Sequence, residues 1–208
     1  MSIGAAAAVG PVLEYLDLAG IAVFALSGAL VAAQKRQTLV TFIFFAVVTG
    51  VGGGTVRDLL IGAPVFWIEA NIILLICFAA AVIVWLLPQR AWRGSALLWL
   101  DAAGLAAYAT FGAAKGFAYG VAPLPAIAMG VLTACLGGII RDVLTGEPSI
   151  LMRRELYVTA AAVSAALMVA LLLLGVAGTI AGPMAALAGF ALRGAAIRRG
   201  WALPAYRR

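Results

Sequence analysis

Two short stretches place an arginine and an aspartate side by side within long apolar segments. The first, GVGGGTVRDLLIGAP (50–64), contains Arg57 and Asp58, and the second, LGGIIRDVLTGEP (136–148), contains Arg141 and Asp142. A charge in the hydrocarbon of a bilayer costs at least about 2.5–3.5 kcal/mol, so such side chains normally face protein or water. We expect either ion pairs that lock parts of the protein together or charges that screen and gate ions, and the two roles are compatible.

Glycines precede both arginine–aspartate pairs. Glycine lacks a Cβ atom and can kink a helix, which releases carbonyl oxygens from the helical hydrogen bonds. Freed carbonyls at membrane depth are tolerated only where they meet protein or line a watery cavity. Two facing kinks would offer oxygen ligands to a transient cation midway across the membrane, with no structural metal site; the alternative is close helix packing through small residues. The glycines concerned are Gly52, Gly53, Gly54, Gly137 and Gly138.

Both stretches belong to a longer duplication at a constant offset of 84 positions. TGVGGGTVRDLLIGAP (49–64) aligns with TACLGGIIRDVLTGEP (133–148), and DLAGIAVFALSGA (17–29) aligns with DAAGLAAYATFGA (101–113). We interpret this as a duplicated unit of three helices. Three crossings change the side of the membrane, so the second unit should be inverted relative to the first. Inverted repeats characteristically place a permeation or binding site near the midplane.

The composition predicts an all-α integral membrane protein. The 208 residues are 65% hydrophobic and 11% charged, with a mean hydropathy of +1.14. A membrane helix needs about 20 mostly apolar residues. We predict one transmembrane domain over 1–208, with repeat 1 at 12–90, repeat 2 at 96–175 and a seventh helix at 178–197, the second and fifth helices being kinked. The seven predicted spans are 12–34, 39–62, 68–87, 97–115, 122–145, 155–175 and 178–197.

The net charge of +6 is read as a signal of orientation and not of nucleic-acid binding. With seven spans, most basic residues fall on one side, which the positive-inside rule assigns to the cytoplasm. We therefore expect the N-terminus outside and the C-terminus in the cytoplasm. The residues that carry this argument are Lys35, Arg36, Arg90, Arg93, Arg153, Arg154, Arg198, Arg199, Arg207 and Arg208.

The remaining polar residues leave two interpretations each. Asp17 and Asp101 are expected at the starts of the first and fourth spans, where a carboxylate could cap the helix or attract cations to a mouth. Hydroxyl side chains in the spans could line a polar path or bond back to their own helix. These hydroxyl residues are Ser27, Thr49, Thr55, Thr110 and Thr133.

Catalysis is not expected. The chain has no histidine and two cysteines in apolar runs, so it offers no nucleophile–base pair, no metal-ligand cluster and no cofactor motif.

The motifs DxxGxxxFAxSGA (17–29) and GGGTVRDLLIGAPVFW (52–67), with their second copies, resemble the prokaryotic members of the TRIC family of trimeric intracellular cation channels. The resemblance covers about residues 12–195. It implies a homotrimer in the lipids of a bacterial inner membrane and one pore inside each protomer. It also implies weakly selective conduction of K+, with Na+ as a second candidate ion, and glycine kinks at the pore. Leu136 stands at the position of Gly52, so the second kink should be milder.

Two other function classes remain open. An alternating-access carrier for a small polar solute such as glycine would also use inverted repeats and broken helices. A structural or regulatory membrane protein without conduction is the third reading. The sequence does not separate a channel from a carrier, because both need polar groups inside the membrane.

Overall fold

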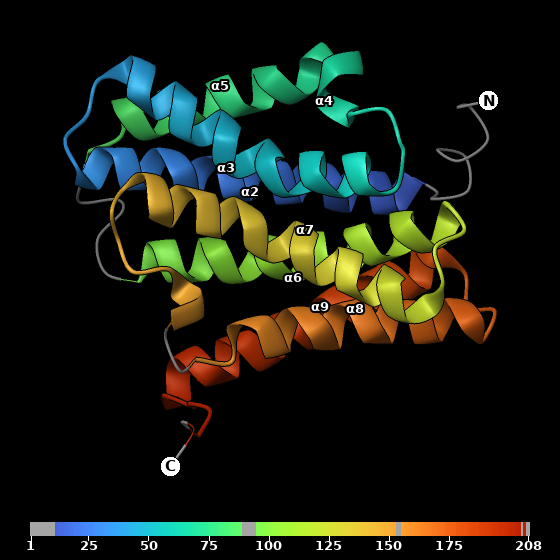
Figure 1. The fold of residues 1–208 in the computed structure, drawn as a ribbon. Helices are drawn as coiled ribbons and strands as arrows, with labels where there is room; N and C mark the ends of the chain where they lie inside the picture. Colours follow the sequence, from blue (N-terminus) through green and yellow to red (C-terminus); the bar gives the residue numbers. More distant parts are fainter. Residues whose placement is uncertain (1–10, 89–94, 153–154, 205, 207–208) are drawn as a thin grey trace.

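The computed structural model describes residues 11–88, 95–152, 155–204 and 206. Its regular elements are helical, as the composition predicted, and Figure 1 shows the long helices side by side along one direction. The elements are α2 (Pro11–Gln34), α3 (Leu39–Leu60), α4 (Phe66–Glu69), α5 (Asn71–Leu86), α6 (Ala96–Ala118), α7 (Pro123–Leu144), the 3-10 helix η2 (Ile150–Met152), α8 (Tyr157–Leu173) and α9 (Gly178–Arg199).

Helix length separates these elements into two classes. Within the described residues, five helices are long and apolar enough to cross a membrane: α2, α3, α6, α7 and α9. The apolar helices α5 and α8 have 16 and 17 residues. At 1.5 Å per residue they span roughly 24–26 Å, slightly less than a hydrocarbon core of about 30 Å. The predicted spans at 68–87 and 155–175 therefore correspond to helices shorter than expected.

Glycines end both α3 and α7 in the same way. Gly62 and Gly146 follow the last helical turns with φ angles of +66° and +68°, a left-handed conformation that favours glycine. A proline stands two residues after each glycine, at Pro64 and Pro148. Each unit therefore turns sharply after its arginine–aspartate pair and enters a short segment that returns along the bundle.

The helices pack in a pattern that repeats. In the first unit α2 packs against α3 and α5, and in the second α6 packs against α7 and α8. The two units meet through α2 with α6 and through α3 with α7. Figure 1 shows that α3 and α7 run in opposite directions, as do α2 and α6.

The crossing of α2 with α6 is built from two aromatic rings and two glycines. The Phe24 and Tyr108 rings lie 5.2 Å apart between centroids, and both side chains are buried. A Cβ atom on Gly20 would lie 2.6 Å from the Tyr108 ring, and one on Gly104 would lie 3.0 Å from the Phe24 ring. Each helix therefore needs glycine where the other places its ring, which agrees with a packing role for both aromatic residues.

Part of the charge pattern can be located. The C-terminal end of α2 lies just before Lys35, and the C-terminal end of α9 contains Arg198. Figure 1 shows these two helix ends at the same end of the bundle. Six other arginines of the orientation argument fall outside the described residues, so the orientation stays a prediction. Those arginines are Arg90, Arg93, Arg153, Arg154, Arg207 and Arg208.

Candidate functional site

The glycine runs lie where α3 and α7 cross at the centre of the protein. A Cβ atom on Gly53 would overlap the carbonyl oxygen of Thr133, and one on Gly137 would overlap the carbonyl oxygen of Thr49, both well inside 3.0 Å. The contact is reciprocal, because Thr49 and Thr133 occupy matching positions of the two units. The glycines therefore allow two backbones to approach more closely than any side chain permits.

The expected interruption of the helices at these glycines is absent. α3 is α-helical throughout Leu39–Leu60, and α7 throughout Pro123–Leu144. No gap in either helix frees a run of carbonyl oxygens for a cation. At Gly53 and Gly137 the partner helix occupies the space beside the glycine, which supports close packing at these two positions. A bend at the glycines and a role for them in ion passage stay predictions.

Arg57 and Asp58 lie at one end of this crossing and are fully buried. Arg57 donates from Nε to Asp58 Oδ1 at 2.8 Å. Its guanidinium carbon lies 5.0 Å from the centre of the Phe111 ring and 5.7 Å from that of Phe66. Both Nη atoms are buried without a hydrogen-bond partner among the described residues. The positive charge of Arg57 is therefore held by one carboxylate and two aromatic faces.

Arg141 and Asp142 lie at the other end and form a denser network. Arg141 donates from Nε to Asp142 Oδ1 at 2.9 Å, and its Nη2 lies 2.8 Å from the same oxygen as an ion pair. Its Nη1 donates to Asp101 Oδ1 at 2.9 Å and to Ser27 Oγ at 3.1 Å. Ser27 and Phe111 occupy matching positions of the repeat. Arg141 therefore meets a hydroxyl where Arg57 meets an aromatic ring.

Both aspartates also fasten the segment that follows their helix. Asp58 Oδ2 accepts a hydrogen bond from the Phe66 amide at 3.2 Å, and Asp142 Oδ2 accepts one from the Ile150 amide at 3.1 Å. Phe66 and Ile150 are themselves matching positions. The aspartates of the two motifs are therefore structural anchors as well as partners of the arginines.

Lys115 of α6 was not among the predicted site residues. Its Nζ lies 2.9 Å from Asp58 Oδ1 and 5.9 Å from the centre of the Phe66 ring, and 13% of its side chain is exposed. The sequence did carry a signal, because a lone lysine lies near the end of an apolar helix. The Asp142 end has no matching lysine on the neighbouring helix, since the position that matches Lys115 is Val31 of α2.

Asp17 and Asp101 are not helix caps. α2 begins at Pro11 and α6 at Ala96, so both aspartates lie beyond the first turn, where the free amide groups are. The sequence placed the helix starts too close to these residues. Asp101 is instead a partner of Arg141, while Asp17 Oδ1 is buried without a hydrogen-bond partner among the described residues.

The hydroxyl residues mostly bond to their own helices. Thr55, Thr110 and Thr133 each donate to the carbonyl four residues earlier, and Ser27 to the one three residues earlier. Only Thr49 Oγ1 is buried without a partner among these five. Two hydroxyls also act as acceptors, Thr55 from the Trp67 indole at 2.9 Å and Ser27 from Arg141. They serve mainly as packing groups, with Ser27 belonging to the Arg141 network.

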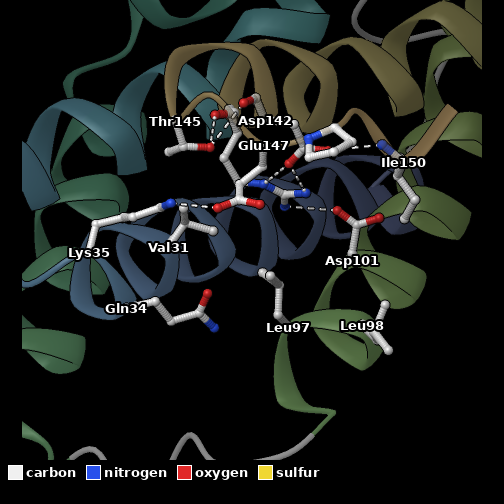
Figure 2. A pocket seen from close by; sticks show the side chains of 12 residues that line it. Val31, Gln34, Lys35, Leu97, Leu98, Asp101, Asp142, Thr145, Glu147 and Ile150 are labelled. Carbon is white, nitrogen blue, oxygen red and sulfur yellow. Dashed lines mark hydrogen bonds and ion pairs between the residues drawn. The ribbon is translucent and has the colours of Figure 1, made fainter. Parts of the chain in front are cut away.

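A cavity of about 210 Å3, here called the vestibule, leads to the Arg141 network. Figure 2 shows Lys35 and Glu147, which form an ion pair, on one side and Asp101 on another. Three carboxylates and two basic groups line it, so its wall has an excess of negative charge at neutral pH. The lining residues are Val31, Gln34, Lys35, Leu97, Leu98, Asp101, Arg141, Asp142, Thr145, Glu147, Pro148 and Ile150.

Two further buried polar residues come from the last two helices. Arg193 of α9 is 1% exposed and donates from Nη2 to Glu155 Oε2. Tyr157 at the start of α8 is also 1% exposed, and its ring lies under the Arg193 guanidinium. An isolated arginine within the apolar run 178–199 was the available sequence signal.

The comparisons with known proteins find the duplication independently. A protein-family model described as "Glycine transporter" matches the chain twice, at residues 14–89 and 98–173, so the two matches begin 84 positions apart. They contain all four residues of the arginine–aspartate motifs and leave out α9.

The curated relatives are described as membrane proteins. A UPF0126 membrane protein of Vibrio cholerae is 42% identical over 71% of this chain, and the match spans 63% of that protein's length. The UPF0126 inner membrane protein YadS of Escherichia coli is 40% identical over 70% of this chain and 72% of its own length. Among solved structures, the TRIC trimeric intracellular cation channel orthologue from Rhodobacter sphaeroides has a TM-score of 0.86 and 43% identity, covering 91% of this chain and 99% of that one.

Proposed function

The chain belongs to the membrane-protein family that includes the UPF0126 proteins and the TRIC cation channels, and on that premise we propose that it is a channel for monovalent cations with a pore inside each protomer. The observation that carries this proposal is the line of buried charges: Asp101, Arg141 and Asp142 at one end of the α3–α7 crossing, and Arg57 and Asp58 at the other.

The proposed pore follows an inverted repeat. The double family match, the opposite directions of α3 and α7, and the reciprocal contacts of Gly53 and Gly137 all support two units related by an axis in the membrane plane. An inverted repeat places equivalent groups at opposite membrane faces. The Arg57 and Arg141 clusters would then be the two ends of a single path through the protomer.

The vestibule supplies the entry on the Arg141 side. Its excess of carboxylates raises the local concentration of cations and lowers that of anions. The conformation described here is closed, because the backbones of α3 and α7 touch at the Gly53 and Gly137 contacts. Conduction requires these two helices to separate, which would open a path beside Thr49 and Thr133. Potassium is the expected main ion, with sodium also permeant, because broad carboxylate-lined paths discriminate weakly between them.

The membrane arrangement completes the proposal. A homotrimer in a bacterial inner membrane is expected by analogy with the relatives, which are a trimeric channel and an inner membrane protein. The arrangement with the N-terminus outside would place the vestibule and the end of α9 on the cytoplasmic side. Apolar side chains exposed on α5, such as Leu75 and Phe78, would then face lipid or a neighbouring protomer.

A carrier for a small polar solute such as glycine is the second candidate. The description of the family model favours it. The difference between the two ends also favours it, since Asp101 is bonded to Arg141 while Oδ1 of the matching Asp17 has no hydrogen-bond partner in the described part of the chain. Alternating access requires two such ends in different states.

A flux experiment separates the two candidates. Purified protein would be reconstituted into planar bilayers and into liposomes, with folding and insertion confirmed first. A channel gives unitary currents and a K+ flux that does not saturate with substrate. Saturable glycine uptake with counterflow, from folded protein that passes no unitary current, would overturn the channel proposal in favour of the carrier.

A further inference from the structure

The last long helix, α9, carries a buried charge of its own. Arg193 is 1% exposed and lies in a helix that has no counterpart in the repeat and falls outside both family matches. A buried arginine in an apolar helix is costly, so it normally marks a functional contact. Its position nearly two turns before the end of α9 makes it separable from the exposed Arg198 and Arg199.

The close approach of α9 to α8 directs Arg193 at the start of α8. A Cβ atom on Gly189 would overlap the Ser164 hydroxyl, so glycine is needed at that contact. One turn later on the same face, Arg193 bonds to Glu155 and stacks over the Tyr157 ring, with the guanidinium carbon 5.4 Å from the ring centre. Arg193 therefore fixes both the backbone segment before α8 and the first side chain of α8.

Tyr157 carries this contact to the Arg141 network. A Cβ atom on Gly138 would lie 3.1 Å from the Tyr157 hydroxyl, 3.4 Å from Asp101 Oδ1 and 3.6 Å from Arg141 Nη2. The three polar groups thus converge on one point, which is open only because residue 138 is glycine. The buried Tyr157 hydroxyl interacts with the Asp101 carboxylate, so the ring that Arg193 covers reaches the ion pair directly.

The first unit lacks both contacts. The residue that matches Tyr157 is Ile73, a buried side chain of α5 without a hydroxyl. In that unit Asp17 Oδ1 and both Nη atoms of Arg57 are unpaired among the described residues. The end of the protein that holds Arg193 and Tyr157 has the bonded Asp101–Arg141 pair. The other end of α9 packs on α2 through Gly182 and Leu13 and brings no matching arginine or tyrosine to Asp17 among the described residues.

We propose that Arg193 and Tyr157 are positioning residues through which α9 holds the Asp101–Arg141 ion pair closed and thereby sets access to the vestibule. The proposal rests on the proposed function for its consequence in conduction. The coupling itself is a property of the folded protein, so it can be measured without a current. Arg193 stacks on the ring, the hydroxyl of the same ring lies against the pair, and loss of either contact frees Asp101 to move.

Thiol modification of the vestibule tests the coupling. Leu97→Cys places a thiol in the vestibule lining, while the native Cys77 and Cys135 are buried and serve as the unreactive background. The rate of reaction with a charged methanethiosulfonate reagent would be measured in Leu97→Cys alone and combined with Arg193→Met, Arg193→Lys or Tyr157→Phe. Arg198→Met is the matched control, because it removes an exposed arginine of the same helix.

We expect Arg193→Met and Tyr157→Phe each to change the rate at least about tenfold, corresponding to about 1.4 kcal/mol. The double variant should resemble either single variant, because both act through one path. The reaction rate in Arg193→Lys should lie between those of Leu97→Cys alone and Arg193→Met. The rate in Arg198→Met should equal that of Leu97→Cys alone. If Arg193→Met does not fold, Tyr157→Phe alone decides, since it removes only a hydroxyl.

An unchanged rate in folded Tyr157→Phe would overturn the proposal, as would an equal change in Arg198→Met. These outcomes are independent of conduction. A protein that passes no K+ current but shows the rate changes would contradict the proposed function and leave the coupling supported. Currents that are present, with rates that do not respond, would contradict the coupling alone.

Discussion

Asp101 of α6 accepts a hydrogen bond of 2.9 Å from Arg141 of α7, and the bonded pair has no equivalent at the matching positions of the first unit. There, Asp17 Oδ1 and the Nη atoms of Arg57 are buried without hydrogen-bond partners among the described residues. Two copies of one motif therefore occupy different states in a single conformation. This difference gives a direct expectation for how the two ends respond to substitution.

Asp101→Asn should destabilise the protein far more than Asp17→Asn. Arg141 keeps Asp142 as a partner, but it loses a buried charged hydrogen bond to Asp101, which is worth about 1.5–3 kcal/mol. Asp17 is only partly buried and has an oxygen that bonds to nothing described, so its loss should cost less than about 1 kcal/mol. Unfolding in detergent, followed by circular dichroism, measures both. Equal losses of stability in the two variants would mean that Asp17 is bonded to Arg57 in solution as Asp101 is to Arg141.

Gly53→Ala and Gly137→Ala should separate α3 from α7. The added methyl group would overlap a backbone carbonyl, which cannot rotate away, so we expect a loss of about 1–3 kcal/mol and an altered K+ flux.

Gly116→Ala is the matched control for these two variants. Its Cβ atom would meet Met129 at 3.4 Å, an ordinary contact, and alanine favours the helix over glycine by about 1 kcal/mol. Flux in liposomes and unfolding in detergent would be compared for the three variants. Wild-type flux in Gly53→Ala would show that the crossing lies off the conduction path.

Lys115→Met should raise the cation current relative to the chloride current. Lys115 forms an ion pair with Asp58 and places a second positive charge beside Arg57. Removing Lys115 leaves Asp58 with Arg57 as its one basic partner among the described residues. The reversal potential in a KCl gradient measures the change, and Lys115→Arg, which keeps the charge, should behave as the wild type. A reversal potential that is the same in both variants would place Lys115 outside the path.

Glu147→Gln should lower the K+ current at low salt and leave it unchanged at high salt. Glu147 and Lys35 line the vestibule and are each about half exposed, so their charges act mainly through the local potential. The Debye length falls from about 30 Å at 0.01 M to about 3 Å at 1 M, which removes that effect.

Lys35→Gln should have the opposite sign, raising the current at low salt. The exchanged pair Lys35→Glu with Glu147→Lys keeps the charges and should resemble the wild type. Planar-bilayer recordings at the two salt concentrations provide the test. A current that Glu147→Gln lowers equally at both concentrations would point to a direct contact with the ion instead of a field effect.

The sequence by itself determined the helical segments and their duplication. The predicted span 12–34 is the helix Pro11–Gln34, and 39–62 is Leu39–Leu60. The first apolar run ends at the charged pair Lys35–Arg36, and the second ends at Gly62 with its left-handed backbone. The offset of 84 positions is found again in the two family matches. Local patterns of this kind are written in neighbouring residues, so no tertiary information is needed to read them.

The roles of individual residues depended on tertiary contacts. A glycine in an apolar helix is equally suited to a kink and to a close crossing, and only the tertiary structure shows the Thr133 backbone beside Gly53. Asp101 could be read as a cap until Arg141 was found 40 positions away in sequence and 2.9 Å away in space. Arg193 and Tyr157 were missed for the same reason: a buried charge acquires its function from the partner that compensates it, and that partner is chosen by the packing of helices.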